Sequence, residues 1–132
     1  MRKTINIESR KRIEYVDITS RVQAVVAETR LGDGVVFLYT PHTTTALTLN
    51  ENESGLISDM QKILEHLVPE GSYQHDKIDN NADAHLRSLI LGQHLMILFT
   101  QGRLELGRWQ SIFFVELDGP RNRKIIFKAL RG

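Results

Sequence analysis

Three histidines, His42, His75 and His85, are the side chains best suited to carry chemistry in this sequence. His42 follows a proline that breaks an apolar run, His75 lies in a polar segment, and His85 stands at the edge of an apolar helical stripe. Three imidazoles and a bound water make an open catalytic zinc site, and imidazole also suits other divalent transition metals. The spacing of these residues matches no metal-binding motif, so each one taken singly is also explained as a surface or hydrogen-bonded histidine.

A second group of polar residues lies near the C-terminal end. Glu116 shares a strand face with Phe114, so its carboxylate either meets solvent at the strand end or enters a pocket, where its pKa would rise unless it were paired. Arg121 and Arg123 follow a turn and are candidate partners, which makes a strand-end salt bridge the alternative. Two guanidiniums on one side of an extended chain would also bind phosphate bidentately.

The segment PHTTTALTLNENE, residues 41–53, begins with His42 and ends in polar residues. Its hydroxyls could add neutral donors for a phosphate, although threonine is also simply a good strand former. We expect this segment to form one wall of a pocket, in which Glu51 or Glu116 would serve as the general base if the protein is a hydrolase. The phosphate-binding candidates in it are Thr43, Thr44, Thr45 and Asn50.

Composition limits the class of protein. The chain has 132 residues, of which 41% are hydrophobic and 25% charged, and this fits one soluble globular domain. It has no cysteine, and its charged N-terminus lacks the apolar region of a secretory signal. The apolar stretch 89–99 is far shorter than a membrane span of about 20 residues, and a net charge of +1 gives no electrostatic case for nucleic acid. We therefore expect a cytoplasmic protein without a nucleic-acid or membrane partner.

The hydrophobic periodicity predicts an α+β fold with a mixed, largely antiparallel sheet and helices on one side. The run 34–39 is continuously apolar, which indicates a strand buried on both faces. Asn52 is the expected cap of a helix that reaches about residue 68 and buries a stripe formed by Leu56, Ile57, Met60, Ile63, Leu64, Leu67 and Val68. The other expected helices cover 17–30 and a segment from 79 or 81 to 92, and the other expected strands cover 3–8, 43–50, 93–99, 109–117 and 124–130.

Several segments taken together resemble the YjbQ-like family, often called the secondary thiamine-phosphate synthase family. They are HTTTAL at 42–47, NENE at 50–53, Asp59, YQHD at 73–76, NADAH at 81–85, LGRWQ at 106–110 and ELDGPR at 116–121. The resemblance covers nearly the whole chain and implies one domain over residues 1–132 whose mixed sheet curls into a half-barrel. It also implies a homotrimer with clefts near the subunit contacts, and a metal, commonly zinc, held by His42, His75 and His85.

The activity that the resemblance implies is the coupling of hydroxymethylpyrimidine diphosphate to a thiazole phosphate, with release of diphosphate. Glu51, Asp59 and Glu116 are the catalytic candidates in this interpretation, and magnesium on oxygen ligands could arrive with the diphosphate. Two alternatives stay open. One is a hydrolase that acts on a small phosphorylated metabolite through metal-bound water, and the other is a non-catalytic trimer that binds such a metabolite.

Overall fold

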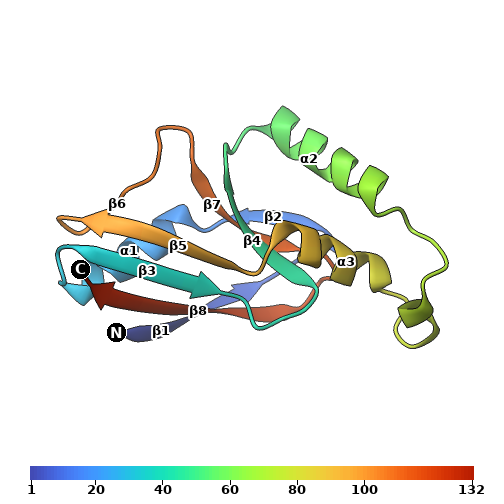
Figure 1. The fold of residues 1–132 in the computed structure, drawn as a ribbon, viewed down its shortest axis with the longest axis horizontal. Coiled ribbons are helices and arrows are strands. Elements are labelled where there is room, and N and C mark those ends of the chain that lie inside the picture. Colours follow the sequence, from blue (N-terminus) through green and yellow to red (C-terminus); the bar gives the residue numbers. More distant parts are fainter.

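Two antiparallel sheets carry the fold, and helices connect and cover them (Figure 1). The computed structural model describes residues 1–132. In chain order the elements are β1 Arg2–Glu8, β2 Glu14–Asp17, α1 Thr19–Thr29, β3 Gly34–Tyr39, β4 Thr45–Asn50, α2 Ser54–Leu67, the 3-10 helix η1 Gln74–Lys77, α3 Ala82–Leu91, β5 His94–Thr100, β6 Arg103–Leu104, β7 Ser111–Glu116 and β8 Asn122–Arg131.

The larger sheet has five strands in the order β1-β8-β3-β5-β6, and the smaller sheet has three in the order β2-β7-β4. All neighbouring strands pair in the antiparallel sense. The larger sheet curls into a half-barrel, and side chains of the smaller sheet pack into its inner face (Figure 1). The fold therefore confirms the α+β class with a largely antiparallel, half-barrel sheet and helices packed on it.

The main hydrophobic core fills the space between the two sheets. Side chains of a strand alternate between its two faces, and the inward residues Val36 and Leu38 of β3 and Ile125 and Phe127 of β8 are fully buried. One end of this core is closed by α1, through a stripe that consists of Val22, Val25 and Val26. The chain leaves α1 at Arg30, whose left-handed φ of 55° ends the helix.

The outer face of the larger sheet is uncovered and apolar. Phe37 and Tyr39 of β3 expose 39% and 46% of their surface there, so the expectation of a strand buried on both faces is wrong. No other layer of this chain packs on the outer side of β3. The continuous run of β-forming residues at 34–39 therefore does not mean burial on both faces. We call this surface the outer apolar face; it consists of Phe37, Tyr39, Met96, Leu98 and Leu130.

The helix α2 touches the rest of the chain through few side chains. Of the apolar stripe predicted to be buried, only Leu64 and the following Val68 are buried, whereas Ile63 and Leu67 are 51% and 58% exposed. Figure 1 shows α2 standing away from both sheets. The amphipathic pattern therefore predicted the helix correctly but not the extent of its burial, because the pattern does not specify which surface covers the stripe.

The start of α2 and three short elements also differ from the sequence prediction. The helix is capped by Glu53, whose carboxylate accepts the Gly55 and Leu56 N–H groups at 2.6 and 2.8 Å, and not by Asn52. The strands β2 and β6 and the helix η1 were not predicted, because elements of 4, 2 and 4 residues give too few positions for a periodic pattern.

The helix α3 covers the side of the smaller sheet that faces away from the main core. Its Ala84 belongs to a second, smaller apolar cluster with Phe113 and Val115 of β7. On the same helix, Arg87 is 2% exposed and donates through Nε and Nη2 to the Val68 carbonyl at 3.2 and 2.7 Å. This buried guanidinium ties the C-terminal end of α2 to α3. None of the helices combines the length and apolarity needed to cross a membrane.

Candidate functional site

A polar cavity lies where three connecting segments meet: residues 40–44 before β4, residues 78–81 before α3, and the start of β8. Its volume is about 460 Å³. It is lined by Pro41, His42, Thr43, Thr44, Asp79, Asn81, His85, Arg121 and Arg123. The structure therefore brings together six of the predicted site residues from three distant parts of the sequence.

Glu116 and Arg123 form a buried ion pair at the wall of this cavity. The Nε and Nη2 atoms of Arg123 donate to the two carboxylate oxygens at 2.9 and 2.6 Å. Ser9 Oγ donates to the same carboxylate at 2.7 Å, and the Asp118 backbone N–H donates at 3.1 Å. Glu116 is 0% exposed and Arg123 is 7% exposed. Such complete hydrogen bonding offsets the cost of removing both charges from water.

The pair keeps Glu116 ionised. Burial raises the pKa of the Glu116 carboxyl, but hydrogen bonds from Arg123, Ser9 and the Asp118 N–H outweigh that effect, so its pKa lies below the ordinary 4.5. The salt-bridge interpretation of Glu116 therefore applies, with Arg123 as the partner. Because both carboxylate oxygens are engaged, Glu116 acts on the cavity by fixing Arg123, and the structure offers no free oxygen of Glu116 to accept a proton.

The turn that joins β7 to β8 packs closely on the segment after β1. The Arg121 N–H donates to Ser9 Oγ at 2.8 Å. A Cβ on Gly119 would collide with the backbone carbonyl oxygen of Lys11, so this approach requires glycine. The close fit holds the start of β8, and with it both arginines, against the cavity.

The two arginines present donors in different ways. Arg121 has a 55% exposed side chain and donates through Nη2 to Asp118 Oδ2 at 3.2 Å and through Nε to the Asp118 carbonyl at 2.9 Å. Arg123 is buried, and its Nη1 makes no hydrogen bond within the chain. Arg121 is thus an exposed donor at the rim of the cavity, whereas Arg123 is a buried one held by Glu116 and Thr44.

The three threonines have separate roles. Thr43 is exposed and lines the cavity, and Thr44 lines it while its hydroxyl accepts from Arg123 Nη2 at 2.8 Å. Thr45 is fully buried and does not line the cavity; its hydroxyl pairs with the Thr40 hydroxyl at 2.6 Å. Thr43 and Thr44 can therefore meet a ligand, and Thr45 stabilises the connection that carries them.

His42 is held in one orientation and is neutral. Its Nε2 accepts the Lys124 backbone N–H at 3.0 Å, which places the proton of a neutral ring on Nδ1. Burial lowers the pKa of His42, and the charges of Arg123 and Lys124 lower it further against the opposing effect of Glu116. His42 therefore offers an N–H donor to the cavity at neutral pH.

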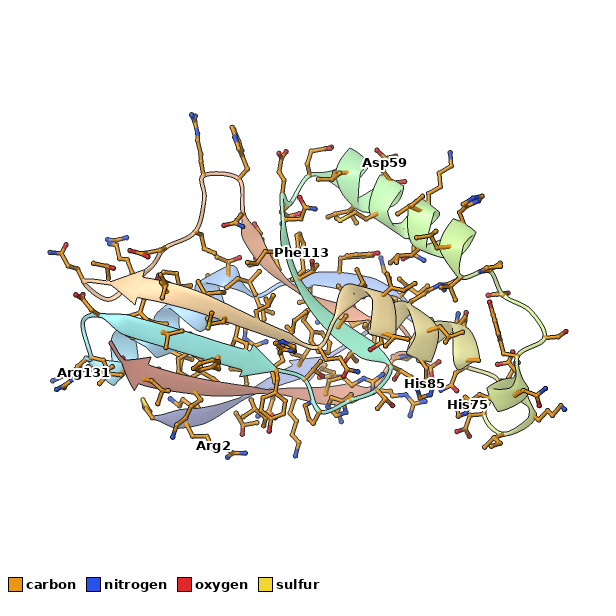
Figure 2. The ribbon with its side chains drawn as sticks, in the orientation of Figure 1. Arg2, Asp59, His75, His85, Phe113 and Arg131 are labelled. Atoms are coloured by element: carbon orange, nitrogen blue, oxygen red, sulfur yellow. The ribbon has the colours of Figure 1, made fainter.

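His75 on η1 and His85 on α3 lie at the same end of the molecule (Figure 2). Their ring centroids are 4.5 Å apart in an edge-to-face arrangement. His75 Nε2 is buried without a hydrogen-bond partner and lies 3.8 Å from Asp79 Oδ2. An orphaned imidazole nitrogen beside a second imidazole and a carboxylate is a donor set that suits zinc.

His42 does not act as a third ligand beside His75 and His85 in this arrangement, because its Nε2 is already hydrogen-bonded. It can offer a ring nitrogen to a metal only if it gives up the bond to the Lys124 N–H or loses the Nδ1 proton. In this arrangement no three His, Asp or Glu side chains converge closely enough to hold a metal ion. His75 and His85 are thus neighbours of a ligand type that zinc takes, and a metal site formed by His42, His75 and His85 stays a prediction.

Asn50, Glu51 and Asp59 lie outside this cavity. Asn50 is the last residue of β4, and the threonines lie at the other end of that strand. The Oδ1 of Asn50 accepts the Glu51 N–H at 2.8 Å. Asp59 is exposed on α2, well separated from His75 and His85 in Figure 2. The catalytic and binding roles assigned to these three residues stay predictions.

Sequence reasoning did not assign a site role to Asp79, Asn81 or Ser9. Asp79 and Asn81 line the cavity, and both were considered only as helix starts. Ser9 lies 107 residues from Glu116 in the sequence, and a single serine after a strand is too common to serve as a signal. Only the fold reveals that these residues share one site.

The comparisons with known proteins identify the family and agree with this fold. A family model described as UPF0047 protein YjbQ-like matches residues 3–132, so the chain belongs to the YjbQ-like family. A UPF0047 protein of Archaeoglobus fulgidus is 50% identical over 127 residues, which cover 96% of this chain and 98% of the relative. The UPF0047 protein YugU of Bacillus subtilis is 37% identical, and the match covers 98% of this chain and 99% of the relative.

Solved structures with the same fold are also known. A YbjQ-like protein of unknown function from Sulfolobus solfataricus superposes with a TM-score of 0.96 at 34% identity, covering 100% of this chain and 97% of that one. A hypothetical protein from Aeropyrum pernix superposes with a TM-score of 0.95 at 34% identity, covering 100% and 99%. The family fold therefore extends over the entire chain.

The buried ion pair predicts a pH-dependent loss of stability. Glu116→Gln should lower the free energy of unfolding by about 3–5 kcal/mol at pH 7, because Arg123 is left buried without its countercharge. The pKa of Glu116 is lower in the folded than in the unfolded state, so its contribution is present above 4.5 and is lost as the pH falls through the folded pKa. Urea unfolding of both proteins should show the difference shrinking below pH 4.5.

A suitable control is Glu28→Gln, which removes an exposed carboxylate of α1 whose only ion pair is a surface one with Lys3, and it should change the free energy of unfolding by less than about 1 kcal/mol. A difference between wild type and Glu116→Gln that stays constant from pH 7 to below 4.5 would contradict a stabilising role for the Glu116 charge.

Proposed function

We propose that the protein binds small phosphorylated metabolites in this cavity and acts as a thiamine-phosphate synthase-like transferase. The single observation that supports the proposal is a set of hydrogen-bond donors that line the cavity together with His42 and His85. We call this set the donor wall; it consists of Thr43, Thr44, Arg121 and Arg123. Guanidinium and hydroxyl groups are the protein groups that most commonly hold phosphate oxygens.

In the proposed reaction, the carbon–oxygen bond to the diphosphate of hydroxymethylpyrimidine diphosphate breaks, and its electron pair leaves with the diphosphate. The ring nitrogen of the thiazole phosphate supplies the electron pair of the new carbon–nitrogen bond. The donor wall would stabilise the charge that develops on the departing oxygen. Arg123 is preorganised for this role, because Glu116 and Thr44 hold its Nε and Nη2 and leave Nη1 without a partner in the chain.

The chemistry of the cavity favours transfer over the hydrolase alternative. Hydrolysis needs a base to activate water; Glu116 has both oxygens occupied and Glu51 lies outside the cavity, so Asp79 or His85 would have to serve. A thiazole nitrogen carries a lone pair and no proton, so its attack needs no base. The protein then has mainly to position two reactants and bind the leaving group.

A divalent metal is part of this proposal. His75 and His85, joined by His42 once its Lys124 bond is released, would hold zinc, and magnesium could enter with the diphosphate. A bound metal would supply positive charge to the phosphate oxygens. The roles proposed for the donor wall do not depend on a bound metal.

We also propose a homotrimer as the working form. The outer apolar face exposes five large apolar side chains next to one another, and contiguous apolar patches commonly mark protein–protein contacts. Contact with further copies of the chain would cover it, and a head-to-tail contact that closes gives a ring.

The synthase proposal predicts a measurable product. Wild-type protein given both precursors and a divalent metal should form thiamine phosphate, detected as its fluorescent oxidation product. Arg121→Gln should lower kcat/KM by roughly 10- to 100-fold, because a hydrogen bond between charged groups contributes about 1.5–3 kcal/mol. Arg103→Gln, which removes an exposed guanidinium from β6, should leave the rate unchanged. Wild-type activity no higher than that of His85→Ala would rule out the synthase reaction.

The metal proposal predicts one zinc ion per chain after zinc loading and gel filtration, measured by atomic emission. His75→Ala and His85→Ala should each lose the zinc, because each removes one imidazole donor. The matched control is His66→Ala, an exposed histidine on α2 that should keep full zinc content. Zinc retained equally by all three variants would refute the histidine site.

The trimer proposal predicts three chains per particle in sedimentation velocity. Leu98→Glu places a charge in the outer apolar face and should shift the particle to a single chain. Ser20→Glu adds the same charge at an exposed position of α1, outside the outer apolar face, and should leave the particle intact. A single chain in the wild type, or a Leu98→Glu protein that still sediments as a trimer, would contradict this interface.

A further inference from the structure

The helix α2 carries an apolar surface of its own that no other part of the chain covers. One side of the helix packs on the chain, where Ile57 contacts the smaller apolar cluster. On the neighbouring side, four apolar residues follow one another at intervals of four, three and four residues, so they form a single stripe along the helix. We call this set the exposed stripe; it consists of Leu56, Met60, Ile63 and Leu67.

The exposed stripe and the outer apolar face lie on different sides of the molecule. The inner side of the larger sheet packs on the main core and the smaller sheet, whereas Ile57 of α2 contacts the cluster on the far side of the smaller sheet. The helix therefore cannot cover the outer apolar face of its own chain (Figure 1). An apolar helix stripe laid on an apolar sheet face is one of the layer arrangements from which protein cores are built.

Acidic residues surround the exposed stripe. The segment 51–70 contains a single lysine, Lys62, and five carboxylates: Glu51, Glu53, Asp59, Glu65 and Glu70. Asp59 is exposed and lies one helical turn from both Leu56 and Ile63, at the edge of the stripe. It forms no ion pair within the chain. The stripe is therefore an apolar surface in negatively charged surroundings.

The charged residues beside the outer apolar face have the opposite sign. Lys128 of β8 pairs with Phe37 in the sheet, and Arg2 of β1 pairs with Lys128, so all three lie in one row across the same face. That row and the next, which contains Tyr39, include no carboxylate. Arg2 and Lys128 are exposed and form no ion pair within the chain.

These charges favour one pairing of the surfaces over the others. A two-fold contact between two outer apolar faces would gather Arg2 and Lys128 of both copies in one interface, and a contact between two α2 helices would gather their carboxylates. Like charges at an interface disfavour association, whereas opposite charges promote it and select the partner. A contact between α2 and the outer apolar face brings opposite charges together and covers both apolar surfaces.

We propose that the exposed stripe of α2 docks on the outer apolar face of a second copy of the chain. The inference rests on the proposed self-association and names the surface that meets the outer apolar face. Because the contact joins two different surfaces, it is head-to-tail. In a closed ring each chain gives its α2 to one neighbour and receives the α2 of the other. The helix, which touches its own chain through few side chains, is then held from both sides.

The test uses two variants that each damage one surface. Ile63→Glu places a charge in the exposed stripe, and Leu98→Glu places one in the outer apolar face. Each variant alone should sediment as a single chain, because every contact needs both surfaces. An equimolar mixture should form particles of two chains, since the intact outer face of the Ile63→Glu chain can receive the intact α2 of the Leu98→Glu chain. Such a particle cannot grow further, because its two remaining surfaces are both damaged.

A control variant separates loss of the stripe from damage to the helix. Ser58→Glu adds the same charge to α2 at an exposed position on the side of the helix away from the stripe. This variant should keep the particle size of the wild type.

Chemical cross-linking tests the same contact without disrupting it. The chain has no cysteine, so Ile63→Cys and Phe37→Cys each introduce a single thiol. After the two variants are refolded together, a short bismaleimide should link Ile63→Cys chains to Phe37→Cys chains. Neither variant should link to itself, because a head-to-tail contact places each surface against the other one.

The outcomes distinguish this inference from the proposed function. An Ile63→Glu protein that keeps the size of the wild type overturns the inference and leaves self-association through the outer apolar face in place. A mixture that stays as single chains, or Phe37→Cys chains that link to one another, overturns it as well. If the wild type is itself a single chain, the proposed trimer fails and the inference fails with it. Two-chain particles that form only in the mixture support the head-to-tail contact.

Discussion

The candidate site depends on one interaction, the buried ion pair between Glu116 and Arg123. Its members and their hydrogen-bond partners come from four separate segments: Ser9 after β1, Thr44 before β4, Glu116 in β7 and Arg123 in β8. A buried charge left alone would cost several kcal/mol, so these segments must be in place together. The pair thereby joins the two sheets at the cavity and sets the direction in which Arg123 presents its remaining donor.

The two-sheet architecture determines what the cavity can do. Antiparallel strands place their connections at the sheet ends, and several of these connections carry the polar side chains that line the cavity. The main core behind them is apolar, so the buried polar groups at this end must find partners among themselves, as Glu116 and Arg123 do. This accounts for a cavity lined by polar and charged side chains from several connections.

Much of the fold followed from the sequence. The helices near 17–30, 52–68 and 81–92 and most strands appear close to their predicted bounds, because hydrophobic periodicity and turn residues act locally. The family resemblance also located the segments of the cavity, and the family itself is confirmed. Burial was predicted less well: β3 and α2 both expose apolar side chains, since a pattern shows that a face is apolar but not what covers it.

The sequence by itself determined the class of fold, the family and the residue types available for chemistry. Only the tertiary structure decided that Glu116 binds Arg123, that Thr45 supports the wall while Thr43 and Thr44 form it, and that α2 leaves an apolar stripe exposed. The bond between Thr44 and Arg123 joins positions 79 residues apart, and the bond between Ser9 and Glu116 joins positions 107 apart. Contacts over such separations leave no local pattern in the sequence, because the packing of the whole chain brings the residues together.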